Sequence, residues 1–262
     1  AYHFIDQLVE MGQSYWQILP IGPTDFTHSP YSSISTFAGN HLLISPDELM
    51  KDQLLIPEEI IFSSKEEANK VDFKTAEKIK NKILNIVCQK FNERASKELH
   101  LAFQKFCKEN SYWLNDYSKY WVIKNANNQQ PWNKWNTENI SNLDELITPK
   151  IIQFLFHSQW QKLRNYCHKN DIQIIGDMPI YVGYDSADVW ANKELFQLEP
   201  HNGMLHQAGC PPCNFEEDGQ IWGNPLYNWG VHEKLNFSWW QQRFEKLFEM
   251  VDIVRLDHFI GF

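Results

Sequence analysis

An arginine and an aspartate stand two residues apart near the end of the chain. Arg255 and Asp257 close the apolar run that begins at Val251. On a β-strand, residues i and i+2 face the same side, so both side chains are expected to lie together. A neighbouring guanidinium favours the ionised carboxylate, which is the state that a nucleophile needs. The alternative is an ion pair that only builds the fold, and the triplet by itself does not decide between the two.

A second aspartate, Asp177, also follows an apolar run, at residues 172–175. Its position predicts a second carboxylate at the end of a strand, where catalytic groups gather in a (β/α)8 barrel. The alternative is an ordinary aspartate at the start of a loop, accepting hydrogen bonds from nearby backbone N–H groups.

Several aromatic residues lie in stretches rich in proline, glycine and asparagine, where a buried helix face does not explain them. They are Tyr31, Trp222 and Trp229. Flat rings beside amide and carboxylate side chains suit a sugar site, because the apolar faces of a pyranose stack on rings while its hydroxyls form hydrogen bonds. Each ring by itself is equally well explained by packing, but together they favour carbohydrate.

Patterns typical of metal or cofactor sites are missing from the sequence. Cys210 and Cys213 have C-x-x-C spacing, but no second pair completes a zinc site, and the prolines between them do not favour the helix of a redox motif. The H-E-x-x-H, G-x-S-x-G and phosphate-binding glycine patterns are also absent. We therefore expect no metal and no cofactor. The five cysteines, odd in number and scattered, indicate free thiols.

The last 110 residues repeat one pattern twice. Amphipathic helices at 150–168 and 238–249 each precede an apolar strand, at 172–175 and 251–256, and each strand is followed by an aspartate. Helix, strand and carboxylate in this order predict an α/β fold with a parallel sheet. Apolar runs at 15–21 and 41–45 predict two more strands, about four in all.

Two long segments interrupt this pattern. Residues 47–150 are rich in Lys, Glu and Asn with helical spacing of apolar residues, which predicts an insertion of two or three helices. Residues 178–237 are rich in Trp, Pro, Gly and Asn, a composition suited to a long ordered loop over an active site.

The charge balance excludes some classes of partner. The chain has 262 residues, with 24 Lys and Arg against 33 Asp and Glu, a net charge of −9. Nucleic acids and anionic membranes bind clustered basic residues, so neither is an expected partner. No run reaches the roughly 18 apolar residues of a membrane-spanning helix, and no signal pattern opens the chain. These features predict a soluble, cytoplasmic protein.

Both ends of the sequence look cut. It starts without methionine inside an apparent helix and stops just after a strand. A (β/α)8 barrel takes about 250 residues, but the two long segments leave room for only about four strands. We therefore expect residues 1–262 to form the N-terminal half of such a barrel, with residues 47–150 as a helical insertion subdomain.

Six motifs, in the same order, resemble the 4-α-glucanotransferases (amylomaltase or disproportionating enzyme). They lie at residues 16–24 (WQILPIGPT), 29–33 (SPYSS), 176–180 (GDMPI), 185–190 (DSADVW), 219–227 (GQIWGNPLY) and 255–259 (RLDHF). The resemblance implies a (β/α)8 barrel of the α-amylase superfamily. It also implies a retaining transfer of α-1,4-glucan segments between maltooligosaccharides, with no cofactor.

The resemblance also implies roles for single residues. Asp257 would be the nucleophile that forms a covalent glucosyl intermediate, and Arg255 would orient and ionise it. The donor sugar would lie against Asp177 and Tyr31. The other substrate-binding residues implied are Ser29, Gln220, Trp222 and His258.

Two features depart from the complete family pattern. In the loop at about 208–217, expected to cover the substrate, Cys213 stands where the family usually has Asp. Retaining transfer also needs an acid/base carboxyl, and no Glu in this sequence matches that motif. We expect that group to come from sequence outside residues 1–262, and this chain by itself to be inactive. The alternatives are an α-glucan hydrolase of the same superfamily and a noncatalytic glucan-binding half-barrel.

Overall fold

Three parallel strands form the sheet that carries the predicted carboxylates. The computed structural model describes residues 1–60, 70–136, 142–212 and 217–262. The strand order is β1 (Tyr15–Gln17), β2 (Gln173–Met178), β5 (Ile253–Leu256). In register, Gln17 lies beside Ile175, and Asp177 lies beside Arg255. Within the described residues β1 and β5 each pair on one side, so both edges of the sheet are open.

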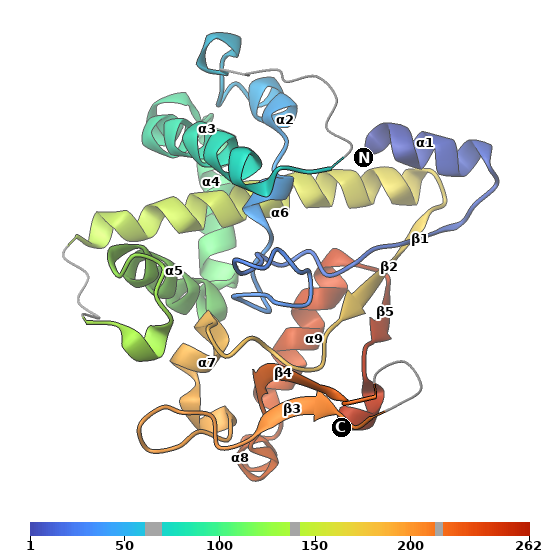
Figure 1. The fold of residues 1–262 in the computed structure, drawn as a ribbon. Helices are drawn as coiled ribbons and strands as arrows, with labels where there is room; N and C mark the ends of the chain where they lie inside the picture. The colour runs from blue at the N-terminus through green and yellow to red at the C-terminus, as the bar shows by residue number, and fades with distance from the viewer. Residues whose placement is uncertain (61–69, 137–141, 213–216) are drawn as a thin grey trace.

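Each strand of the parallel sheet follows a helix, as the repeated pattern predicts for β2 and β5. α1 (Tyr2–Glu10) precedes β1, α6 (Ile147–Lys169) precedes β2, and α9 (Ser238–Met250) precedes β5. Figure 1 shows α6 running across the molecule, with α1 near its C-terminal end. Trp160 of α6 donates a hydrogen bond to the Met250 carbonyl at the end of α9, 2.8 Å away. The apolar faces of these helices and of β2 belong to one buried core.

The strand predicted at 41–45 is absent, so that prediction is wrong. His41–Leu43 form a short 3-10 helix (η1), and the Asn40 side chain caps it by accepting a hydrogen bond from Leu42 N. A run of three apolar residues is too short for its periodicity to separate a strand from a helical turn. The four-strand count is therefore not met in the described residues, which hold three parallel strands.

Helices fill most of the range predicted as an insertion. After α2 (Pro46–Lys51) and η2 (Pro57–Glu59) come three long helices and two short turns. These are α3 (Phe73–Arg94), α4 (Lys97–Glu109), α5 (Ser111–Ala126), η3 (Trp132–Lys134) and η4 (Leu143–Leu146). α3, α4 and α5 all contact α6 and share its core. Whether they form a subdomain stays a prediction.

The segment between β2 and α9 contains regular structure that its loop-like composition does not predict. It holds α7 (Ala187–Ala191), η5 (Lys193–Leu195), an antiparallel hairpin and α8 (Trp229–Lys234). The hairpin pairs β3 (Gln207–Cys210) with β4 (Gln220–Pro225). The chain then passes through α9 and β5 to the last turn, η6 (Phe259–Gly261).

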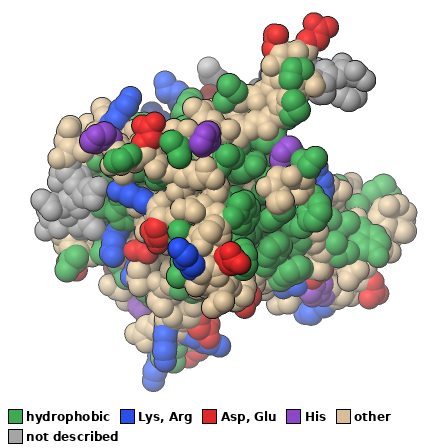
Figure 2. All heavy atoms as spheres, turned by 90° about the horizontal axis from the view of Figure 1, so that it is seen from below, with side chains coloured by type: hydrophobic (Ala, Val, Ile, Leu, Met, Phe, Trp, Pro, Cys, Tyr) green, Lys and Arg blue, Asp and Glu red, His purple; other side chains and the backbone are tan. Residues whose placement is uncertain are grey.

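Hydrophobic side chains gather over a broad area of the face seen in Figure 2. Exposed apolar residues of the chain include Ile221 of β4, 81% exposed, and Ile260 of η6, 86% exposed. An apolar surface of this kind is typical of a face covered by other protein or by a ligand.

None of the helices in the described ranges is both long enough and apolar enough to cross a membrane.

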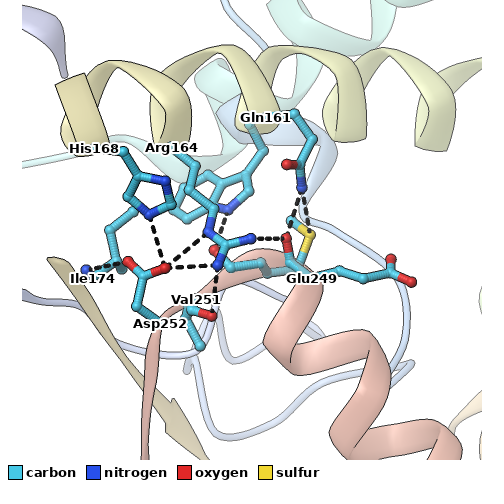
Figure 3. A network of polar contacts seen from close by, with 9 residues as sticks. Gln161, Arg164, His168, Ile174, Glu249, Val251 and Asp252 are labelled. Atoms are coloured by element: carbon cyan, nitrogen blue, oxygen red, sulfur yellow. Dashed lines mark hydrogen bonds and ion pairs between the residues drawn. The ribbon is translucent and has the colours of Figure 1, made fainter.

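A polar network joins α6 to the start of β5, at the end of the sheet away from Asp257 (Figure 3). One oxygen of Asp252 accepts hydrogen bonds from Arg164 (2.6 Å) and His168 (2.8 Å). The other accepts from the backbone N–H of Ile174 in β2 (2.8 Å). Burial by itself raises the pKa of Asp252, but these hydrogen bonds outweigh it and hold that pKa below its ordinary value. The network therefore ties α6, β2 and β5 together through one carboxylate.

Replacing this carboxylate should cost stability in a pH-dependent way. For Asp252→Asn, we expect the free energy of unfolding at pH 7 to fall by about 2 kcal/mol. Because the folded-state pKa is depressed, this contribution is present above the unfolded pKa of about 3.9 and is lost as the pH falls through the folded value. Urea unfolding at a series of pH values measures it.

A carboxylate on a more exposed ion pair provides the control. Asp52 pairs with Lys162 of α6, and the two side chains are 26% and 41% exposed. Asp52→Asn should change stability by less than about 1 kcal/mol. If the Asp252→Asn deficit stayed constant down to the lowest pH, the carboxylate charge would not be its cause.

Candidate functional site

One guanidinium joins two carboxylates at the C-terminal ends of β2 and β5. Arg255 Nη1 donates to both oxygens of Asp177, at 2.7 Å each, and Nη2 donates to Oδ1 of Asp257 at 2.8 Å. The i, i+2 spacing therefore places Arg255 and Asp257 together as predicted. Asp177 lies inside β2, so its interpretation as an ordinary loop-start aspartate is wrong. Its register position opposite Arg255 explains the contact.

The two carboxylates differ in exposure and in free acceptor sites. The side chain of Asp177 is 2% exposed, whereas that of Asp257 is 34% exposed. In the part of the chain that the structure describes, Oδ2 of Asp257 accepts no hydrogen bond. Asp177 holds the arginine from the buried side, and Asp257 presents an open oxygen to the solvent side.

Tyr31 completes the buried end of this cluster. Its hydroxyl donates to Oδ2 of Asp177 at 2.6 Å, across 146 residues of sequence. This hydrogen bond to the carboxylate, together with burial, raises the pKa of Tyr31, so the phenol stays protonated at neutral pH. Ser29 lies in the same turn, where its hydroxyl oxygen is 3.4 Å from the Tyr31 backbone N–H. The loop after β1 therefore brings Tyr31 and Ser29 to the strand ends.

The guanidinium of Arg255 is a member of the cluster whose pKa responds to its partners. The pKa of Arg255 is raised, first by its hydrogen bonds to Asp177 and also by Asp257. One guanidinium therefore bonds to two carboxyl groups, and the second oxygen of Asp257 has no hydrogen-bond partner among the described residues.

The β3–β4 hairpin supplies the predicted aromatic side of the site. Trp222 Nε1 donates to the Gln220 side-chain oxygen at 2.9 Å, and the Trp222 ring lies 4.9 Å from His258, edge to face. His258 directly follows Asp257 and adopts a left-handed backbone conformation, with φ of 49°. Gln220, Trp222 and His258 therefore gather beside the carboxylate. Cys213, in the predicted covering loop, lies outside the described residues.

Trp229 does not join this group. Its ring stacks on Trp240 of α9, with centroids 5.8 Å apart, and packs against Tyr227 at 5.2 Å. The loop-like composition around it concealed the short helix α8, whose first residue it is. For Trp229, the packing interpretation holds.

Two functional candidates were missed from the sequence. Tyr181 lines the same cleft as Tyr31 and Asp177, with its ring centroid 6.3 Å from both Trp222 and His258. Arg243 of α9 also lines this cleft. The signal for Tyr181 was its place four residues after Asp177. Arg243 gave no signal, because it lies on a helix among packing residues.

No cluster suited to a metal ion occurs among the described side chains: no three His, Cys, Asp or Glu residues converge there. Cys210 lies on β3 and is free, as are Cys88, Cys107 and Cys167. The polar groups of the site are thus carboxylate, guanidinium, phenol and amide. Groups of these kinds can donate hydrogen bonds to a hydroxyl or accept them from one.

Comparison with known proteins places this chain in a family. A family model described as 4-alpha-glucanotransferase matches residues 1–262. The 4-alpha-glucanotransferases of Clostridium butyricum and Aquifex aeolicus are 41% and 39% identical over 100% of this chain, which covers 56% and 55% of their lengths. The chain thus spans about half the length of these curated relatives.

Solved structures agree with the sequence comparison. An amylomaltase from Streptococcus agalactiae, in complex with acarbose, superimposes with a TM-score of 0.93 at 33% identity, covering 100% of this chain and 55% of that one. An amylomaltase from Corynebacterium glutamicum matches with a TM-score of 0.77 at 15% identity, over 99% of this chain and 38% of that one. The second likeness concerns the fold alone.

Replacing Arg255 should show how much its bond to the buried carboxylate of Asp177 contributes to stability. Arg255→Met leaves Asp177 without its cationic donor, and we expect the free energy of unfolding to fall by about 2–3 kcal/mol. Adding Asp177→Asn should recover part of that loss, with a coupling of at least about 1 kcal/mol between the two changes. Urea unfolding of the two single variants and the double variant measures the coupling.

Asp257→Asn is the matched control for exposure. Because Asp257 is one-third exposed, its loss should cost under about 1 kcal/mol. Strictly additive effects of Arg255→Met and Asp177→Asn would mean that their ion pair contributes nothing to stability.

Proposed function

The chain belongs to the 4-alpha-glucanotransferase family, and we propose that in the whole protein it supplies the nucleophile and the donor-sugar side of the active site. The proposed reaction cleaves an α-1,4 bond of a maltooligosaccharide and passes the glucan to the 4-hydroxyl of another sugar. The observation that carries the proposal is the Asp177–Arg255–Asp257 cluster. There, one buried carboxylate anchors an arginine that orients a second, exposed carboxylate.

In the proposed first step, Oδ2 of Asp257 attacks the anomeric carbon of the donor sugar. The bond from that carbon to the glycosidic oxygen breaks, and the departing 4-oxygen takes a proton from an acid. In the second step, an acceptor 4-hydroxyl attacks the glucosyl ester, gives its proton to the same group, and restores the Asp257 carboxylate. Two displacements retain the α configuration.

Asp177 is a poor candidate for the acid. Both of its oxygens accept hydrogen bonds from Arg255, and one also accepts from Tyr31. We therefore place the acid/base carboxyl in the part of the whole protein outside residues 1–262. A retaining pair is separated by about 5–5.5 Å, so that carboxyl would face Asp257 across the cleft. The open edges of β1 and β5 support the related proposal that the three strands belong to a closed (β/α)8 barrel.

The aromatic hairpin supports sugar binding beside the nucleophile. Trp222 is 37% exposed and lies against His258, so its ring is available to a second sugar. Tyr31, 38% exposed, offers a similar ring on the donor side. Transfer is favoured over hydrolysis if an acceptor sugar on this surface excludes water from the ester. Cytoplasmic location stays a prediction, supported by the free cysteines of the described residues.

The nucleophile is tested with Asp257→Asn in the full-length protein. An amide is a far weaker nucleophile than a carboxylate, so we expect transfer from maltotriose to fall by at least about 10³-fold, while acarbose binding changes little. Product analysis should show glucose and longer oligomers for the wild type. Glucose and maltose alone would indicate the rival α-glucan hydrolase.

Asp252→Asn, at the opposite end of the same strand, is the matched control. Assayed below its melting temperature, it should keep wild-type turnover, because Asp252 is bonded to α6 and β2 at the end of β5 opposite Asp257. Full turnover by Asp257→Asn would remove Asp257 from its proposed role. Wild-type protein that leaves maltotriose intact would refute the proposed activity.

A further inference from the structure

We propose that Arg243, on α9, is a positioning residue that holds the donor-sugar side of the site in place. The proposal rests on the proposed function and adds a residue outside the motifs that carry the family resemblance. Arg243 touches neither Asp257 nor Arg255. It acts through residues 179–183, the backbone segment that leaves β2 directly after Met178.

The guanidinium of Arg243 makes its hydrogen bonds to this segment. Nη1 donates to the Ile180 carbonyl at 2.9 Å, and Nη2 donates to the Pro179 carbonyl. Nη1 also lies 3.1 Å from the hydroxyl of Tyr227, which itself donates to the Ile180 carbonyl at 2.6 Å. Two successive carbonyls are thus held by one planar donor, an arrangement that the single ammonium of lysine cannot reproduce.

Burying the guanidinium of Arg243 costs hydration, which its hydrogen bonds and ring contacts must offset. Arg243 is 3% exposed, and Nε has no hydrogen-bond partner among the described atoms. The guanidinium carbon lies 5.5 Å and 5.0 Å from the ring centroids of Trp239 and Trp240. The rings restrict where the guanidinium can move, so it offers its donors in one direction, toward residues 179 and 180.

Residues 179–183, and Met178 directly before them, lie against several parts of the donor side. The carbonyl of Met178, just before it, accepts a hydrogen bond from the backbone N–H of Asp257 at 3.0 Å. Tyr181, within it, lines the cleft beside Asp177. A Cβ on Gly183 would lie 2.8 Å from the Ser33 carbonyl, so the segment also abuts the loop that carries Tyr31. A shift of this segment would move Asp177, Tyr31 and Asp257 relative to one another.

Lys246, one turn further along α9, provides an unusually close control. It is 5% exposed, and its ammonium lies over two rings, 5.5 Å from Trp113 and 5.8 Å from Phe106. Its hydrogen bonds, however, go to Asn110 and Glu249, at 2.7 Å each. Both residues are thus buried cations on one helix over paired aromatics, and both line the cleft. Only Arg243 is hydrogen-bonded to residues 179 and 180.

The test compares Arg243→Met, Arg243→Lys and Lys246→Met in the full-length protein. For each, kcat and KM are measured for transfer from maltotriose, and the dissociation constant is measured for acarbose. For Arg243→Met we expect kcat to fall roughly 100-fold, as for a displacement of about 1 Å at the reacting groups. The acarbose dissociation constant should rise about tenfold. Arg243→Lys should fall between Arg243→Met and the wild type, and Lys246→Met should stay within about twofold of the wild type in all three quantities.

The dissociation constant separates positioning from simple loss of folded protein. A smaller folded fraction lowers the measured turnover but leaves KM and the acarbose dissociation constant of the remaining molecules unchanged. The inference is overturned if Arg243→Met changes turnover alone, or if Lys246→Met matches it in acarbose affinity. If the wild-type protein is active, either of these two results contradicts the role of Arg243 without contradicting the proposed function. Inactive wild-type protein that also fails to bind acarbose refutes the proposed function and this inference together.

Discussion

The site depends on the bond between Arg255 and the buried carboxylate of Asp177. Two carboxylates at neighbouring strand ends repel each other, and burying one of them is costly without a paired cation. The forked guanidinium resolves both constraints, since one nitrogen binds Asp177 and the other binds Asp257. This geometry requires β2 and β5 to lie in parallel register with Asp177 opposite Arg255. The helices and the core serve the site by holding that register.

The sheet carries arginine–carboxylate contacts at both ends, and the contrast shows what makes one of them chemically useful. At the end where β5 begins, both oxygens of Asp252 accept hydrogen bonds and its side chain is 9% exposed. At the end where β5 finishes, Asp257 accepts a hydrogen bond from Arg255 through one oxygen, and its side chain is 34% exposed. The same pair of residue types therefore ties elements together at one end, and at the other it holds the carboxylate that we propose as the nucleophile. Asp257 differs from Asp252 in its greater exposure and in having an oxygen that accepts no hydrogen bond among the described residues.

The aromatic richness of the chain serves three purposes in the structure. Many rings pack in the core, such as Trp160 of α6, which bonds to the carbonyl at the end of α9. Tyr31 instead lines the cleft beside Asp177, and Trp222 lies partly exposed against His258. Others surround buried cations on α9, where ring faces help to compensate for lost hydration. Composition alone cannot assign a ring to one of these roles, and Trp229 illustrates the error.

The sequence by itself determined the features that depend on local periodicity. The two-residue spacing places Arg255 and Asp257 on one side of a strand, and the helix–strand repeat predicts α6–β2 and α9–β5. Ordered motifs predict the family. Only the tertiary structure decided that Asp177 lies within β2 opposite Arg255, that Tyr31 reaches it across 146 residues, and that residues 41–43 are a helical turn. It also showed that Arg243 donates hydrogen bonds to the carbonyls of residues 179 and 180. These features depend on strand register and on contacts between distant segments, which periodicity along the chain does not encode.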